Sequence, residues 1–205
     1  MTDTGGGYAW ANLAAMFYDQ VDKYGDKPML WAKRDGTYRA LSWGDVAARV
    51  TGLARGLQQL GVEPGDRVVL VSENRPAWLV ADIAIMSIGA ITVPAYTTNT
   101  EADHLHILED SGAKGAIVST KRLAERLIPA AAKAAELSFV IAMDRPDGSA
   151  PENVDVLALD KILEMGRAAH TNIVELSGQW PMNDTACIIY TSGTGGAPKD
   201  RKSVV

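Results

Sequence analysis

The sequence has 205 residues, of which 47% are hydrophobic and 22% are charged, and its formal net charge is −5. These proportions are typical of a globular domain and exclude an intrinsically disordered chain. The negative charge argues against a nucleic-acid partner that is bound through a general positive field.

The cysteine content, the amino terminus and the longest apolar segment further limit the class of protein and its location. The single cysteine, Cys187, lies in the apolar run ACIIY, so we expect a buried, unreactive thiol and neither an intrachain disulfide nor a cysteine-rich zinc site. The start MTDTGGGYAW lacks the basic and apolar regions of a secretory signal, which predicts a cytoplasmic location. The apolar stretch 77–96 is interrupted by Asp82, so we expect a buried helix and a strand there and no transmembrane helix.

The first forty residues predict a helix followed by a β-hairpin. Apolar residues recur at helical spacing over 11–24, and Gly25 ends the pattern. The dipeptide Asp35-Gly36 favours a tight turn between short strands at 29–33 and 37–41.

From residue 42 onward the sequence alternates between helix and strand. Ser42, with Asp45 three residues later, predicts the cap of a helix that reaches Gly61, and Thr100 with Asp103 predicts a second such cap. The near-continuous apolar run at 67–71 is typical of a strand in a parallel sheet. Further strands are expected at 91–93, 115–119, 137–143 and 186–190, further helices at 77–88, 121–136 and 159–169, and polar connections at 144–153 and before residue 184.

This alternation predicts an α/β fold with a mostly parallel sheet and flanking helices. Ligands of such sheets bind beyond the carboxyl ends of the strands. The stretch TSGTGGAPKD, residues 191–200, occupies such a position after the strand expected at 186–190.

The composition of this stretch suits a polyphosphate. Its glycines allow successive backbone N–H groups to converge on an anion, while its hydroxyls and a lysine add donors and a positive charge. A plain turn would have a similar composition, and this interpretation stays open. The Walker pattern does not fit, because Pro198 and Asp200 flank Lys199, and the dinucleotide fingerprint fails at Pro198 too.

The segment IIYTSGTGGAPK resembles the phosphate-binding signature TSGTTGxPKG of the adenylate-forming enzymes, the AMP-dependent synthetase and ligase superfamily. The likeness extends over most of the chain, because LSWGDVAARVTGLARGLQQLGVEPGDRVVLVSENRPAWLVADIAIMSIGAITVPAYTT is similar to the amino-terminal region of long-chain acyl-CoA synthetases. In this family a large α/β domain precedes a small, mobile carboxyl-terminal domain.

The resemblance implies a chemistry and a set of partners. ATP and a fatty acid would form an acyl adenylate with release of pyrophosphate, and coenzyme A would then take the acyl group as a thioester, with Mg²⁺ assisting. Peripheral membrane association of the full-length enzyme would fit a long acyl substrate. The ATP phosphates would be held by Thr191, Ser192, Gly193, Thr194, Gly195, Gly196 and Lys199.

The pattern also departs from the family. Gly195 replaces a threonine, Asp200 replaces a glycine, and RKSVV does not resemble the usual continuation. The family's adenine-pocket, ribose-binding and carboxyl-terminal catalytic residues lie downstream of the loop, so no catalytic residue is assigned. We therefore expect residues 1–205 to be a partial AMP-binding domain, truncated and inactive, with its outer sheet edge uncovered. One alternative is a non-catalytic nucleotide-binding or interaction module that retains half of the ligase fold. Another is a fragment that neither folds stably nor binds a ligand.

Other polar residues give weaker signals. His104 and His106 are expected on different faces of one helix, which excludes a paired metal site, and His170 stands alone. Glu73, Asn74 and Arg75 follow a predicted strand and could approach a ligand, although the start of a helix explains this stretch equally well. No role is assigned to Tyr96, Thr97 or Thr98.

Overall fold

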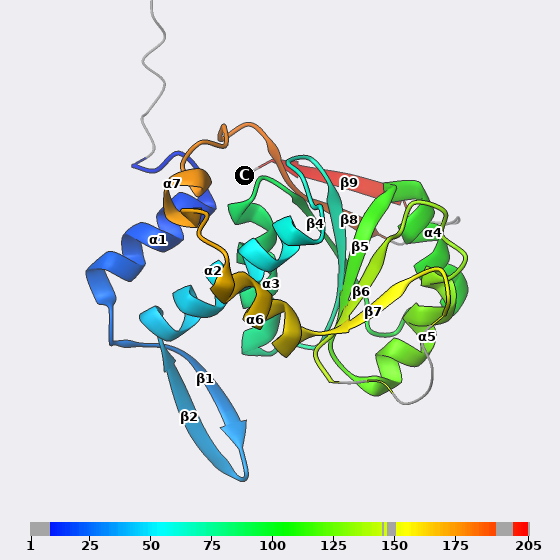
Figure 1. The fold of residues 1–205 in the computed structure, drawn as a ribbon, viewed down its shortest axis with the longest axis horizontal. Helices are drawn as coiled ribbons and strands as arrows, with labels where there is room; N and C mark the ends of the chain where they lie inside the picture. Colours follow the sequence, from blue (N-terminus) through cyan, green and yellow to red (C-terminus); the bar gives the residue numbers. More distant parts are fainter. Residues whose placement is uncertain (1–8, 145, 147–150, 192–198, 205) are drawn as a thin grey trace, which may run out of the picture.

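A seven-stranded sheet forms the centre of the molecule, and a separate two-stranded hairpin between α1 and α2 projects from the helices on one side (Figure 1). The computed structural model describes residues 9–144, 146, 151–191 and 199–204. The sheet order is β7-β6-β5-β3-β4-β8-β9, and every neighbouring pair is parallel except β8 and β9. These strands are β3 (Arg67–Val71), β4 (Ile91–Ala95), β5 (Ala113–Val118), β6 (Phe139–Ala142), β7 (Asp155–Ala158), β8 (Thr185–Thr191) and β9 (Lys199–Val204). The predicted α/β class and parallel sheet are confirmed.

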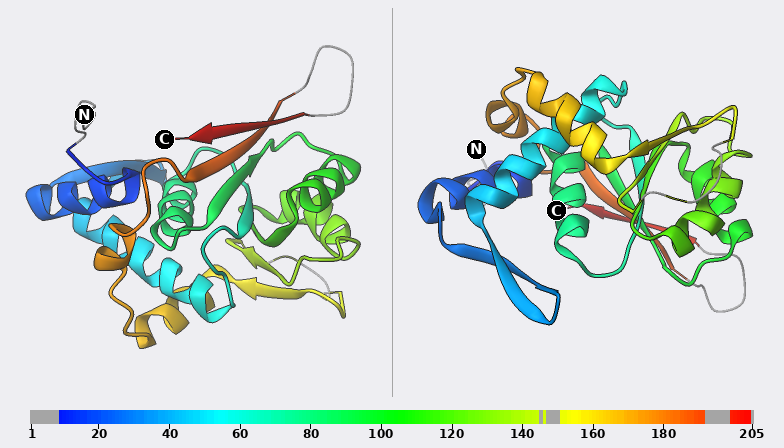
Figure 2. Two further views of the ribbon diagram at one scale, coloured as in Figure 1. Left: turned by 90° about the horizontal axis from the view of Figure 1, so that it is seen from above. Right: turned by 60° about the horizontal axis from the view of Figure 1, so that its bottom comes forward.

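Helices cover both faces of the sheet (Figures 1 and 2). One face packs against α1 (Leu13–Tyr24), α2 (Trp43–Gln59), α3 (Pro76–Ser87), α6 (Leu159–Ala168) and α7 (Ile173–Ser177). The other packs against α4 (Glu101–Ser111) and α5 (Lys121–Ala131). Val68 and Leu70 of β3 belong to the first core, and Val69 and Val71 belong to the second. This alternation is why the run at 67–71 is apolar throughout.

Local sequence signals fix several helix starts. Ser42 and Asp45 form a capping box on α2, and Thr100 and Asp103 form another on α4, so both predicted caps are confirmed. Asn12 caps α1 through its side chain. These bonds satisfy first-turn N–H groups that have no partner within the helix.

The order of strands reverses at the middle of the sheet. After β3 the chain passes through α3 on one face to β4, whereas after β5 it passes through α5 on the other face to β6. In open α/β sheets, ligands bind where the connections diverge to opposite faces, which is here between the carboxyl ends of β3 and β5.

The hairpin of β1 (Pro28–Arg34) and β2 (Thr37–Ser42) forms as predicted around Asp35 and Gly36. Both turn residues have positive φ, 49° and 81°, which a tight hairpin turn requires. The hairpin extends away from the body of the molecule (Figure 1).

Several expectations about element boundaries were wrong. The helix expected at 121–136 ends at Ala131, soon after Pro129, and the strand expected at 137–143 spans only Phe139–Ala142. The short strand β7 follows the polar connection expected at 144–153, and the short helix α7 lies within the polar connection expected before residue 184.

The outer edge of β8, expected to be uncovered, pairs with β9. The thiol of Cys187 is half-buried rather than buried, because β8 lies near the edge of the sheet. In the described part of the chain, no helix is long and apolar enough to cross a membrane.

Candidate nucleotide-binding site

The predicted phosphate loop connects β8 and β9. Thr191 is the last residue of β8, and it is the register partner of Lys199, the first residue of β9. The loop therefore leaves and re-enters the sheet at paired positions beyond the carboxyl end of β8. Ser192, Gly193, Thr194, Gly195 and Gly196 lie outside the described residues, as does the side chain of Lys199.

Strand β8 is tied to α4 immediately before the loop. Tyr190 is only 4% exposed, and its hydroxyl donates a hydrogen bond of 2.7 Å to Oδ2 of Asp110. The ring of His106 packs edge-on against Tyr190, with 6.1 Å between ring centroids. On the inner side, Thr92 of β4 pairs in parallel with Cys187. These contacts hold β8 in place, so that Thr191 lies at the carboxyl edge of the sheet.

A second polar group lies where the sheet order reverses. Ser119, after β5, donates a hydrogen bond of 2.5 Å to Oε2 of Glu73, after β3. This bond is the main reason why the pKa of the Glu73 carboxyl is below its usual value, with smaller contributions from the charges of Arg75 and Arg122. The carboxylate is therefore already engaged by the protein.

Arg75 makes an ionic contact at this edge. Its guanidinium lies 3.9 Å from the carboxylate of Asp144, and both side chains are partly exposed. Sequence reasoning noted Glu73 and Arg75 but missed their partners. The available signal was that Ser119 and Asp144 both follow strands expected to end at the same edge of the sheet.

The histidines do not gather around a metal. His104 is fully buried, His106 contacts Tyr190, and His170 is exposed. The described residues contain no group of three carboxylate, histidine or cysteine side chains that could hold a metal ion. Tyr96 is 60% exposed beyond β4.

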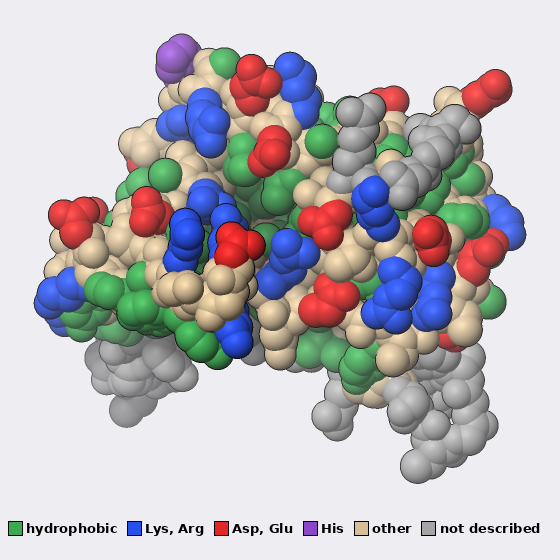
Figure 3. Space-filling view, turned by 90° about the horizontal axis from the view of Figure 1, so that it is seen from below, with side chains coloured by type: hydrophobic (Ala, Val, Ile, Leu, Met, Phe, Trp, Pro, Cys, Tyr) green, Lys and Arg blue, Asp and Glu red, His purple; other side chains and the backbone are tan. Residues whose placement is uncertain are grey.

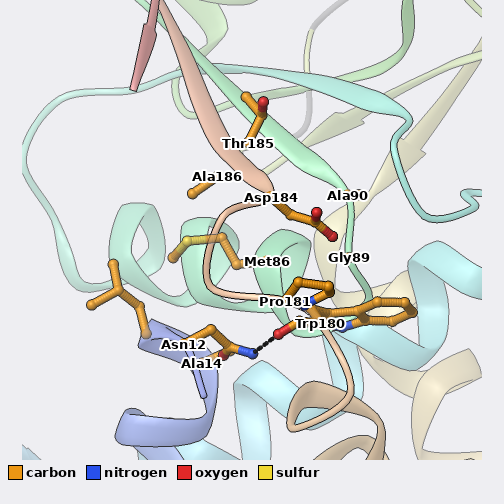
Figure 4. Close-up of a pocket in the computed structure, with 11 residues that line it drawn as sticks. Asn12, Ala14, Met86, Gly89, Ala90, Trp180, Pro181, Asp184, Thr185 and Ala186 are labelled. Atoms are coloured by element: carbon orange, nitrogen blue, oxygen red, sulfur yellow. Dashed lines mark hydrogen bonds between the residues drawn. The ribbon is translucent and has the colours of Figure 1, made fainter. Parts of the chain in front are cut away.

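A small pocket lies at the opposite edge of the sheet, where β4 and β8 begin (Figure 4). Its volume is about 50 Å³, far below the roughly 300 Å³ of small ligand pockets. Asn12 donates hydrogen bonds of 2.7 and 3.0 Å to the carbonyls of Ser177 and Trp180, and the Trp180 indole donates one of 3.0 Å to the carbonyl of Ser87. These bonds join α1, α3 and the connection before β8, so the pocket is part of the structural framework.

The fold and the loop position together define an α/β protein with a phosphate-loop candidate at the carboxyl edge of its sheet. The family model described as AMP-binding enzyme matches residues 17–200, and the chain belongs to this family.

The curated relatives are long-chain-fatty-acid–CoA ligases. FadD15 of Mycobacterium tuberculosis is 32% identical over 191 residues, which is 92% of this chain and 30% of that protein. ACSBG1 of Rattus norvegicus is 26% identical over 186 residues, covering 90% of this chain and 25% of that protein. The chain thus spans less than a third of the length of these relatives.

Solved structures support the fold. The A-PCP didomain of carboxylic acid reductase from Segniliparus rugosus, in complex with AMP, has a TM-score of 0.80 at 19% identity, over 98% of this chain and 32% of that one. The anthranilate CoA ligase AuaEII, in complex with anthranoyl-AMP, has a TM-score of 0.79 at 20% identity, over 97% of this chain and 35% of that one. At such identities the likeness concerns the fold.

Proposed function

We propose that this chain is the ATP-binding part of a ligase that activates a long-chain fatty acid, first to an acyl adenylate and then to an acyl-CoA thioester. Residues 1–205 would be the amino-terminal part of its AMP-binding domain. The substrates would be ATP, a fatty acid and coenzyme A, with Mg²⁺ accompanying the triphosphate, in the cytoplasm. Membership of the AMP-binding enzyme family and the ligase names of the curated relatives support this assignment.

The main structural observation that supports the proposed phosphate site is the register pair between Thr191 and Lys199. The pair holds the two ends of the loop at adjacent positions, and the glycines in its sequence permit the conformations that an anion-binding nest of backbone N–H groups requires. This geometry fits a triphosphate at the carboxyl edge of β8, where ligands of parallel sheets bind.

Each loop residue has a role in the proposal. The hydroxyls of Thr191, Ser192 and Thr194 donate hydrogen bonds to phosphate oxygens, and the Lys199 ammonium offsets their charge. Gly193, Gly195 and Gly196 let the backbone approach those oxygens closely. The fatty-acid carboxylate would attack the α-phosphorus of ATP, so that the adenylyl group is transferred and pyrophosphate leaves. The loop stabilises the negative charge that develops on this leaving group, which is electrostatic catalysis.

Measuring the affinity of the chain for ATP tests the proposed phosphate-binding loop. We expect Lys199→Ala to weaken ATP binding at least roughly tenfold, because a charge-assisted hydrogen bond contributes about 1.5–3 kcal/mol. The matched control is Lys202→Ala, which removes the same charge from β9 beyond the loop. Equal affinities of the Lys199 variant and the parent protein would reject the site.

The catalytic part of the proposal has a separate readout. A protein that contains this chain and makes an acyl adenylate exchanges pyrophosphate into ATP only when a fatty acid is present. Absence of exchange with every chain length tested would reject the ligase activity. Lysine-dependent ATP binding without exchange would instead support the non-catalytic nucleotide-binding module.

A further inference from the structure

A basic hollow lies beneath the hairpin, apart from the candidate nucleotide site. It has a volume of about 380 Å³ and lies between β1, β2, α2 and the start of α3. Figure 3 shows Lys and Arg side chains gathered around a depression on this face. Its lining consists of Ala32, Lys33, Arg34, Arg39, Ala40, Leu41, Arg49, Arg75, Pro76 and Ala77.

Three separate parts of the fold bring arginines to this hollow. Arg39 pairs across the hairpin with Ala32, and both lie on the hairpin face that also carries Leu30 and Leu41, which pack against the core. Arg49 comes from α2, and Arg75 is the N-cap residue of α3. Residues far apart in the sequence thus create one concentration of positive charge in a chain with a net charge of −5.

Nearby carboxylates offset only part of this charge. The carboxylate of Asp45 accepts a hydrogen bond from the backbone N–H of Ser42, and the charge of Arg49 contributes slightly to lowering its pKa. The carboxylate of Asp144 lies 3.9 Å from the guanidinium of Arg75. Asp35 lies at the hairpin turn beside Arg34. Among the described residues that line the hollow there is no Asp or Glu. The cationic side chains that line the hollow would attract an anion that enters it.

The side chains around the hollow suit a phosphate group. Guanidinium groups present paired donors that match phosphate oxygens, and Pro76 and Ala77 add the first turn of α3, where no side chain caps the helix. The positive end of a helix dipole adds to this attraction. The volume falls within the range of small-molecule sites, roughly 300–1,000 Å³.

We propose that the hollow between the β1–β2 hairpin and α3 binds a phosphorylated ligand with more than one negative charge, at a site separate from the Thr191–Lys199 loop. A free phosphate compound and a phospholipid headgroup share this chemistry.

Binding assays with defined probes test the proposal. Pyrophosphate is titrated by calorimetry into the Lys199→Ala protein, so that the loop does not contribute, and phosphatidic-acid vesicles are tested by co-sedimentation. The test variant is Arg39→Gln/Arg49→Gln, and the control is Lys161→Gln/Arg167→Gln, which removes two exposed charges from α6. We expect the test variant to bind at least roughly tenfold more weakly than the parent, and the control to bind like the parent.

The two assays also distinguish a free phosphorylated ligand from a phospholipid headgroup. Loss of pyrophosphate binding in the test variant supports a free phosphorylated ligand, and loss of vesicle binding alone supports a headgroup. Binding of neither probe, or an equal effect of the control variant, overturns the proposal. Circular dichroism and thermal melting check that the variants are folded. Should the double variant unfold, the exposed Arg34→Gln substitution replaces it and is expected to weaken binding of the same probe.

Discussion

His104 shows how a single side chain can limit the pH range of this fold. It is fully buried on α4, and neither ring nitrogen has a hydrogen-bond partner among the described residues. Burial lowers the pKa of the imidazole, the nearby Arg126 lowers it slightly, and Asp103 opposes this shift. The folded protein therefore holds His104 neutral, whereas the unfolded chain accepts a proton more readily.

This difference predicts a loss of stability in mild acid. Since the pKa in the folded state is below that in the unfolded state, the unfolded state binds more protons once the pH falls below about 6.5. The free energy of unfolding should then decrease by at most about 1.4 kcal/mol per pH unit. His104→Leu should reduce this slope, as measured by urea unfolding at about pH 7.5 and 5.5.

The control is His170→Gln, which replaces an exposed histidine and removes no buried imidazole. An identical pH dependence in the His104→Leu and parent proteins would contradict the assignment. Below about pH 5, carboxylates with lowered pKa values, such as Asp45 and Glu73, also contribute to the pH dependence of stability. The His104 variant and the parent protein are therefore compared above about pH 5.

At the residue scale, the sequence supports the site only in part. Thr191 and Lys199 could be singled out because glycine-rich loops have a recognisable composition. The bond between Ser119 and Glu73 could not, because it joins side chains from two strands whose adjacency depends on the sheet order. Arg34, Arg39 and Arg49 of the basic hollow were missed for the same reason, and Arg75 was noted only as a residue that follows a strand.

At the scale of elements, the tightest contact is the crossing of α2 and α6. A Cβ atom added at Gly166 would lie 1.8 Å from the carbonyl oxygen of Gly52, and one added at Gly56 would lie 2.4 Å from the side chain of Ile162. Glycines on both helices thus allow their backbones to approach closely. Helix α6 can in this way rest directly on α2 and bury Ile162.

Gly166→Ala should destabilise the protein, although alanine normally favours a helix over glycine by about 1 kcal/mol. The helices would have to separate, and overpacking of this kind costs about 1–3 kcal/mol or more. The expected result is a lower midpoint of urea unfolding. Gly178→Ala is the control, because its nearest new contact would be 3.6 Å away and its φ of −76° suits alanine. Similar midpoints for both variants would contradict the close crossing.

Elements with strong local signals were predicted well, and those that depend on tertiary contacts were not. Strand β3 matches its expected range of 67–71 because both of its faces are buried. The short strand β7 has only four residues and is stabilised by pairing with β6 at the edge of the sheet. Strand β9 has a polar sequence, KDRKSV, and pairs with β8 although its composition gives no strand signal.

At the scale of the whole molecule, Trp180 holds the N-terminal helix to the sheet domain. Its ring packs against Gly89, where an added Cβ would lie 2.9 Å from the indole, and its N–H donates to Ser87. Its own carbonyl accepts a hydrogen bond from Asn12, which caps α1 (Figure 4). One residue therefore connects α1, α3 and the connection to β8.

Trp180→Ala should lower the free energy of unfolding by about 3 kcal/mol, at the low end for large core residues because Trp180 is partly exposed. The control is Trp31→Ala in the hairpin, where 59% exposure predicts a change of about 0.5 kcal/mol or less. Chemical denaturation followed by circular dichroism compares them. Equal losses in the two variants would show that Trp180 does not hold these segments together.

The pairing of β4 with β8 also has a consequence for how the chain folds. Thr92 pairs with Cys187 only after the chain has passed through β5, β6, β7, α6 and α7, so this contact closes a very long loop. Local strand–helix–strand units form before such distant contacts, because closing a longer loop costs more chain entropy. During synthesis, β3 to β6 can therefore assemble while the strand that carries the candidate nucleotide loop is still being made. The candidate ATP site is in this sense the last part of the sheet to acquire its neighbours.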